Sequence, residues 1–167
     1  MRRIPRAPTT PTGGGSVTSD PFARVVIPIA SVDDARKTAR AVGHRIAGAK
    51  GTGIFVSVVE KAGGAPDKAS VEQREQWAEE AFEVVRNEID DSVAIETAIH
   101  YGTDVAATIV RTAHQYDANA IAFTPRGGSR WVKLLTGDVT NSLVATSDLP
   151  VVVLPDTETD GCPSDSS

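Results

Sequence analysis

The residues best suited to chemistry lie in one segment, residues 124–155, with the sequence TPRGGSRWVKLLTGDVTNSLVATSDLPVVVLP. Between an apolar run and an amphipathic stretch it holds two adjacent glycines, Gly127 and Gly128, flanked by Arg126 and Arg130. A strand that passes through a glycine loop into a helix directs free backbone N–H groups and the helix dipole at one point, which is typical of a phosphate site. Asp138 opposes this reading, because a carboxylate about 4 Å from a phosphate is repelled by roughly 4 kcal/mol at an effective dielectric of about 20.

Ordinary structural roles also account for these residues. Asp138 can cap the helix that follows, a role worth about 1 kcal/mol, and Gly127 with Gly128 can form a tight turn without a ligand. Arg126, Arg130 and the nearby Lys133 can be solvated charges, or they can form a site for a phosphate, an adenine nucleotide or an acidic partner segment. The loop alone therefore leaves the ligand open.

The elements that must position this loop follow from the hydrophobic pattern. β-Branched runs predict strands at residues 24–29, 53–59, 93–100, 119–124 and 150–155. Between them, apolar residues recur at three- and four-residue spacing and predict helices, one of which carries Ala78, Ala81, Phe82 and Val85 toward the core. Right-handed crossovers then wind the chain into a five-stranded parallel α/β sheet with helices on both faces. The alternation in residues 93–100 indicates an edge strand.

Composition limits the function further. The 167 residues form one domain, and the net charge of −5 without clustered Lys and Arg gives no electrostatic case for nucleic acid. Residues 1–20 and 157–167 are poor in apolar residues and are expected to be disordered tails around a domain at 21–156. The single cysteine, Cys162, excludes an intrachain disulfide, and no apolar run is long enough to enter a membrane. A cytoplasmic location is expected.

Residues for catalysis are not apparent. The three histidines, His44, His100 and His114, have no metal-site spacing, and no serine lies in a G-x-S-x-G elbow. We therefore expect that the chain is not an enzyme, with a small hydrolase as the weakest of three hypotheses.

Several motifs together resemble the universal stress protein family. They are VVIPIA at 25–30, GTDVAATI at 102–109, DANAIAFTPRG at 117–127 and LPVVVLP at 149–155. The resemblance extends over roughly residues 22–156. It implies a sheet of order 3-2-1-4-5 and a homodimer built through the last strand, at Val151, Val152 and Val153.

The nucleotide-binding branch of that family carries Gly, two residues, Gly, nine residues, then Gly followed by Ser or Thr. Gly127 and Gly137 match the second and third glycines, whereas Thr124 replaces the first glycine and Asp138 replaces the hydroxyl. Ala30 replaces the acid that this branch has at the end of the first strand. By resemblance, the ligand-contacting positions are Ala30, Val58, Arg126, Gly127, Gly128, Arg130, Gly137, Asp138 and Val139.

These departures predict a dimeric, non-catalytic stress-response module with a degenerate nucleotide site and no expected cofactor. Its partners would be a second copy and another protein, a transporter being one class. The alternative prediction is a sensor that binds ATP or another adenine nucleotide through the Gly127 loop and the following helix.

Overall fold

The computed structural model describes residues 19–61, 68–124 and 138–155 of the chain. Strands and helices alternate along it, as predicted. In order they are β1 (Arg24–Pro28), α1 (Val32–Ala49), β2 (Thr52–Glu60), α2 (Lys68–Glu88), β3 (Ala94–Gly102), α3 (Val105–Gln115), β4 (Ala120–Phe123), α5 (Asp138–Thr146) and β5 (Val151–Val153). The tails predicted to be disordered, residues 1–20 and 157–167, lie outside this description except for Ser19 and Asp20.

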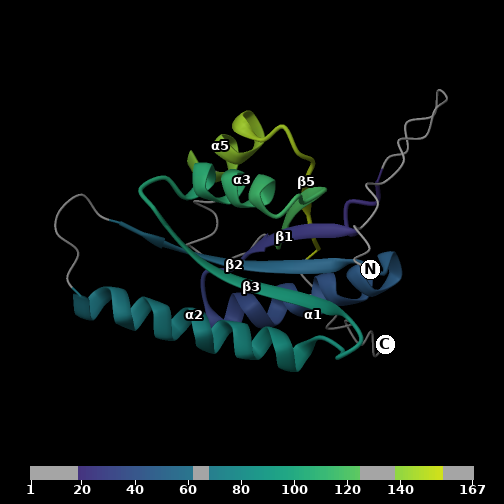
Figure 1. Ribbon diagram of the computed structural model, residues 1–167, viewed down its shortest axis with the longest axis horizontal. Coiled ribbons are helices and arrows are strands. Elements are labelled where there is room, and N and C mark those ends of the chain that lie inside the picture. The colour runs from purple at the N-terminus through teal and green to yellow at the C-terminus, as the bar shows by residue number, and fades with distance from the viewer. Residues whose placement is uncertain (1–18, 62–67, 125–137, 156–167) are drawn as a thin grey trace, which may run out of the picture.

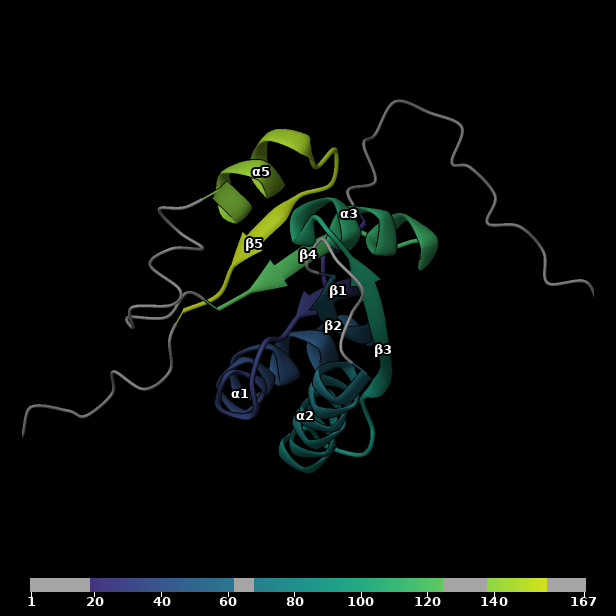
Figure 2. The same ribbon diagram turned by 90° about the vertical axis from the view of Figure 1, so that its left-hand side faces the viewer.

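The five strands form one parallel sheet of order β3-β2-β1-β4-β5, which confirms the predicted fold. Helices α1 and α2 cover one face, and α3 and α5 cover the other (Figures 1 and 2). β3 and β5 are the two edges. The strand order confirms the edge position predicted for residues 93–100, although the side chains along β3 are almost uniformly half-buried and do not alternate.

Local sequence explains where α1 begins and ends. Ser31 caps its first turn by accepting a hydrogen bond from the Asp34 N–H at 3.2 Å. The helix stops at Lys50, which adopts a left-handed conformation with φ of 49°. The apolar residues at three- and four-residue spacing in this helix pack against the sheet and α2: Ala35, Ala39, Val42 and Ile46 are fully buried and Val32 is partly buried.

Backbone hydrogen bonding changes at the carboxyl end of β1. The Ile29 N–H donates to the Val56 carbonyl at 2.9 Å, so alternate residues of β1 turn their backbone groups toward β2. Pro28 therefore faces β4, and as a proline it has no N–H to donate there. The β1–β4 ladder contains only two register pairs, whereas β1 and β2 share five. The β1–β4 ladder thus ends before Pro28, near the strand ends where parallel sheets bind ligands.

Candidate functional site

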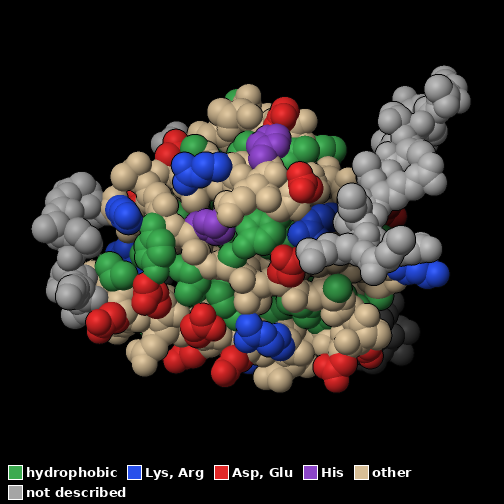
Figure 3. Space-filling model, in the orientation of Figure 1, with side chains coloured by type: hydrophobic (Ala, Val, Ile, Leu, Met, Phe, Trp, Pro, Cys, Tyr) green, Lys and Arg blue, Asp and Glu red, His purple; other side chains and the backbone are tan. Residues whose placement is uncertain are grey.

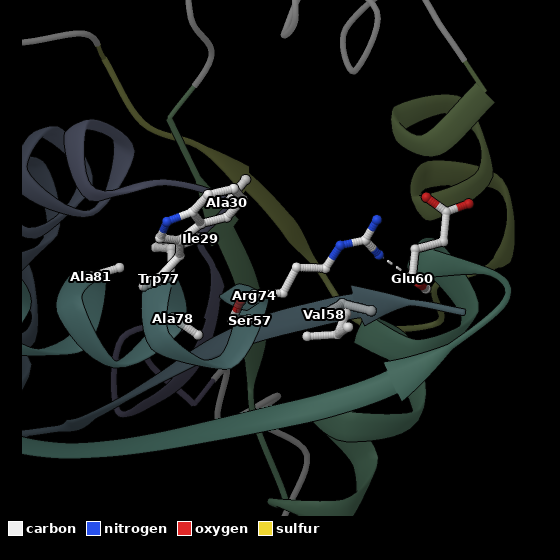
Figure 4. A pocket seen from close by; sticks show the side chains of 10 residues that line it. Ile29, Ala30, Ser57, Val58, Glu60, Arg74, Trp77, Ala78 and Ala81 are labelled. Atoms are coloured by element: carbon white, nitrogen blue, oxygen red, sulfur yellow. Dashed lines mark hydrogen bonds between the residues drawn. The ribbon is translucent and has the colours of Figure 1, made fainter. Parts of the chain in front are cut away.

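A pocket of about 450 Å³ opens at the carboxyl ends of β1 and β2, with α2 as its outer wall (Figure 4). Its lining includes Ala30, Val58, Glu60, Arg74, Trp77 and Ala78. Two of the positions inferred from the family resemblance, Ala30 and Val58, are therefore brought together. The pocket has the size of a small-molecule site and lies at the edge where doubly wound sheets bind their ligands.

Backbone groups of β2 supply polar atoms to this pocket. The Val56 carbonyl faces β1, where it accepts the Ile29 N–H. Alternation along the strand turns the N–H and C=O of Val58 to the same side, beyond the last residue of β1. The side chain of Val58 packs instead against the core under α3, so its contribution to the pocket is the backbone. A donor and an acceptor on one residue match the hydrogen-bonding edge of a base.

The β1 side of the pocket lacks an acid. Ala30 is exposed, and its N–H donates to Asp34 Oδ2 at 2.9 Å. The Asp34 carboxylate is 1% exposed and also accepts from Thr38 Oγ1 at 3.2 Å. Asp34 therefore organises the turn between β1 and α1. Sequence reasoning missed this role, because a charged residue directly before the apolar residues of a helix is usually exposed to solvent.

Helix α2 is tied to the strand ends beside the pocket. Arg74 Nη1 donates to the Glu60 carbonyl at 2.8 Å, and the Tyr101 hydroxyl donates to the Glu75 carboxylate. The hydrogen bond to Glu75 is the main cause that raises the pKa of Tyr101, since it stabilises the protonated phenol. Trp77 lies one turn further along α2 and is 54% exposed. The sequence analysis did not identify Arg74 or Trp77, because periodicity marks only the buried stripe of a helix.

The other positions of the predicted site follow β4 in the sequence, at residues 126–139. Arg126, Gly127, Gly128, Arg130 and Gly137 lie outside the described residues. α5 begins at Asp138, so Asp138 and Val139 are in its first turn, without a description of their side chains. Thr124, directly after β4, is 1% exposed, and its Oγ1 has no hydrogen-bond partner.

The histidines lie apart from this pocket. His44 and His114 are exposed on helices, and His114 Nε2 lies 2.7 Å from Asp148 Oδ1. His100 is on β3, edge-on to the Tyr116 ring at 6.4 Å. Burial lowers the pKa of His100, and the positive charge of Arg111 lowers it further. Residues 19–61, 68–124 and 138–155 contain no group of three or more His, Cys, Asp and Glu side chains that could hold a metal ion.

The surface in Figure 3 shows acidic side chains gathered along α2 and basic ones scattered between them. The exposed acids of this helix include Glu72, Glu79, Glu80 and Glu83. Such a face repels a phosphate backbone. No helix within the described ranges is long and apolar enough to cross a membrane.

Comparison with known proteins places these features in context. A model of the universal stress protein family matches residues 21–155. The fold is similar to a universal stress protein from Archaeoglobus fulgidus, with a TM-score of 0.61, 18% identity, and coverage of 78% of this chain and 91% of the other.

Two further structures share the fold. A universal stress protein from Archaeoglobus fulgidus in complex with dAMP has a TM-score of 0.58 and 19% identity, over 78% of this chain and 96% of the other. One from Lactobacillus plantarum has a TM-score of 0.60 and 22% identity, over 79% of this chain and 97% of the other. A comparison with curated proteins gave no match.

Proposed function

Because the chain belongs to the universal stress protein family, we propose that it is a non-catalytic stress-response module that acts through protein partners and has a degenerate nucleotide pocket. One observation carries this proposal. The β1 side of the pocket presents the methyl group of Ala30, and the Asp34 carboxylate, which accepts the Ala30 N–H, is buried and bonded to the turn. The pocket therefore lacks an acid at this side that could hold a sugar hydroxyl.

The proposed assembly is a homodimer through β5. This strand is an edge of the sheet, and edge strands expose backbone groups that favour pairing with another strand. Val153 is 53% exposed, whereas Val152 packs against the core under α1 and α2. An exposed valine on an otherwise anchored edge suits a contact between two copies. A cytoplasmic location and a further protein partner, such as a transporter, belong to the same proposal.

A second candidate function is an adenine-nucleotide sensor. It is favoured by the backbone N–H and C=O of Val58, which face the pocket beyond the end of β1. A related fold has been solved in complex with dAMP. In this function the pocket would hold the base through Val58, and the sugar would receive little recognition from Ala30.

Calorimetric titration of ATP with magnesium separates the two candidates. The degenerate-pocket proposal predicts binding weaker than micromolar for the wild type. Ala30→Asp should strengthen it about tenfold, because a hydrogen bond to a charged group contributes roughly 1.5–3 kcal/mol. Ala30→Asn is the matched control, since it has nearly the same shape without the charge. Asp138→Ser, added to Ala30→Asp, should strengthen binding again by removing repulsion of the phosphates.

Micromolar binding of ATP by the wild type would overturn the degenerate-pocket proposal in favour of the sensor. Equal affinities for the wild type and Ala30→Asp would contradict the role given to position 30. Native mass spectrometry of the freshly purified protein reports independently on the dimer, and a monomer would reject assembly through β5.

A further inference from the structure

We propose that Trp77 forms an aromatic wall of the pocket and stacks on the planar base of a nucleotide, so that this chain recognises the base and is indifferent to the sugar. This inference rests on the second candidate function, the sensor, and deepens it. It assigns to α2 a ligand contact at a residue that lies outside the glycine loop and outside the ends of the strands.

The position of Trp77 is unusual for a large apolar residue. It lies next to Ala78, which is 4% exposed, and four residues before Ala81, which is 2% exposed, yet its own side chain is 54% exposed. The indole is therefore at the border of the buried stripe, where α2 meets the pocket. Figure 4 shows it extending from α2 toward Ala30. An exposed indole at a pocket rim costs free energy by contact with water, which a ligand ring would remove.

Neighbouring contacts hold this wall in place. Arg74, one turn before Trp77, bonds the Glu60 carbonyl at 2.8 Å, and Glu75 accepts from the Tyr101 hydroxyl. These bonds fix α2 to the ends of β2 and β3. Trp has only two side-chain torsions, so a base that stacks on it loses little affinity to ordering of the side chain.

The opposite side of the pocket is apolar and small. Ile29 and Ala30 line it from β1, and they leave the space that a longer acidic side chain would fill. A flat ring can then lie with one face toward the indole and its edge toward the Val58 backbone. Stacking of a base on an aromatic side chain is worth about tenfold in affinity, and a larger ring system gains more.

This arrangement predicts a distinctive selectivity. AMP and dAMP should bind with affinities within about twofold of each other, because a sugar hydroxyl held by a carboxylate would separate them by about tenfold or more. Both should bind better than CMP, whose single ring offers a smaller stacking face. Ribose 5-phosphate, which has no base, should bind too weakly to detect.

The experiment uses the full chain carrying Trp131→Phe, which leaves Trp77 as the sole tryptophan. Titration with AMP should quench the indole fluorescence, excited at the red edge of its band, where adenine does not absorb. Calorimetry then gives the AMP affinity of Trp77→Ala and Trp77→Phe in the otherwise wild-type chain. Trp77→Ala should lose about tenfold and Trp77→Phe less than about threefold, since phenylalanine keeps a stacking face. The exposed position makes both variants compatible with folding, and the melting temperature checks this.

Each outcome decides the proposal. Quenching by AMP, equal affinity for dAMP and the ordered loss in the two variants would support it. An unchanged AMP affinity in Trp77→Ala would overturn the stacking role while leaving the sensor function intact. Absence of calorimetric binding of AMP, dAMP and ATP to the wild type would overturn both the stacking role and the sensor, and leave the interaction module.

Discussion

The two faces of the sheet are built differently. On one face, α1 and α2, with 18 and 21 residues, cover a continuous core that includes Phe55, Phe82 and Ile46. On the other face, α3 and α5, with 11 and 9 residues, cover a smaller cluster around Ile54, Ile109 and Leu143. Buried apolar area is the main source of stability, so the first face should determine whether the chain folds. The second face, beside the exposed β5 edge, should determine what it assembles with.

Two buried polar groups differ in their partners. On the first face, the Asp34 carboxylate accepts hydrogen bonds from Ala30 and Thr38. On the second, the buried Nε2 of His100 has no partner. The bonded carboxylate is held in place, whereas an unpaired imidazole responds to pH.

The strongest test of the first face is Gly51→Ala, at the turn from α1 into β2. A Cβ atom there would lie 1.9 Å from the Phe22 carbonyl oxygen and 2.8 Å from that of Ala23. Since both are backbone atoms, we expect a loss of about 3 kcal/mol or more in the free energy of unfolding. Urea denaturation followed by circular dichroism measures it.

Gly48→Ala, one residue before the last residue of α1, is the matched control for Gly51→Ala. A Cβ at Gly48 meets nothing within 4 Å, and the residue is inside α1. Helix propensity should then raise the stability by roughly 1 kcal/mol. Equal effects of the two substitutions would contradict the tight closure of this face.

On the opposite side of the molecule, we expect assembly to be sensitive to substitutions in β5. Val153→Lys should yield monomer by light scattering, because it places a charge on the exposed edge with little loss of core packing. Val144→Lys, on α5, changes a valine that is 62% exposed and should leave the dimer intact. A dimer that survives Val153→Lys would exclude β5 as the interface, and dissociation by both variants would extend the interface to α5.

The smallest expected effect is the pH dependence contributed by His100. Burial, and then the charge of Arg111, hold the pKa of His100 below its ordinary value, so the unfolded chain takes up this proton at a higher pH than the folded one. The stability that this group contributes is complete above about pH 6.5, the ordinary pKa of histidine. It is lost as the pH falls toward the lowered pKa of the folded state. His100→Gln should reduce the slope of the urea denaturation midpoint against pH across that range.

His44→Gln controls for the loss of a histidine, because His44 is exposed on α1. It should leave the slope as it is in the wild type. A slope that is the same for His100→Gln and the wild type would show that His100 does not contribute to the pH dependence.

Much of the fold could be predicted from the sequence because the hydrophobic pattern carries it. Ala35, Ala39, Val42 and Ile46 of α1 are buried as their spacing indicates, whereas β3 is almost uniformly half-buried in spite of its alternating sequence. Boundaries were less accurate where the backbone decides them. β5 was expected at 150–155 but is Val151–Val153, since Pro150 has no N–H to donate to a ladder.

The candidate site was harder to predict, for a physical reason. Ala30 and Val58 were identified because motifs mark strand ends. Trp77 was missed because its role depends on α2 folding back over those ends, a distance relation that no local pattern encodes. The glycine loop, which suggested a ligand first, lies outside the described residues, so its contribution stays a prediction.

Pro28 has a consequence for how the end of β1 is held. Because it has no N–H, the β4 position opposite it receives no ladder hydrogen bond from β1, and the ladder between these strands cannot extend to the end of β1. The last residues of β1 are therefore held by β2, to which Ile29 donates its N–H. Since this limit is set by the covalent chain, the strand pairing that leads into the pocket is the same before and after a ligand arrives, and a ligand has no β1–β4 hydrogen bond to break there.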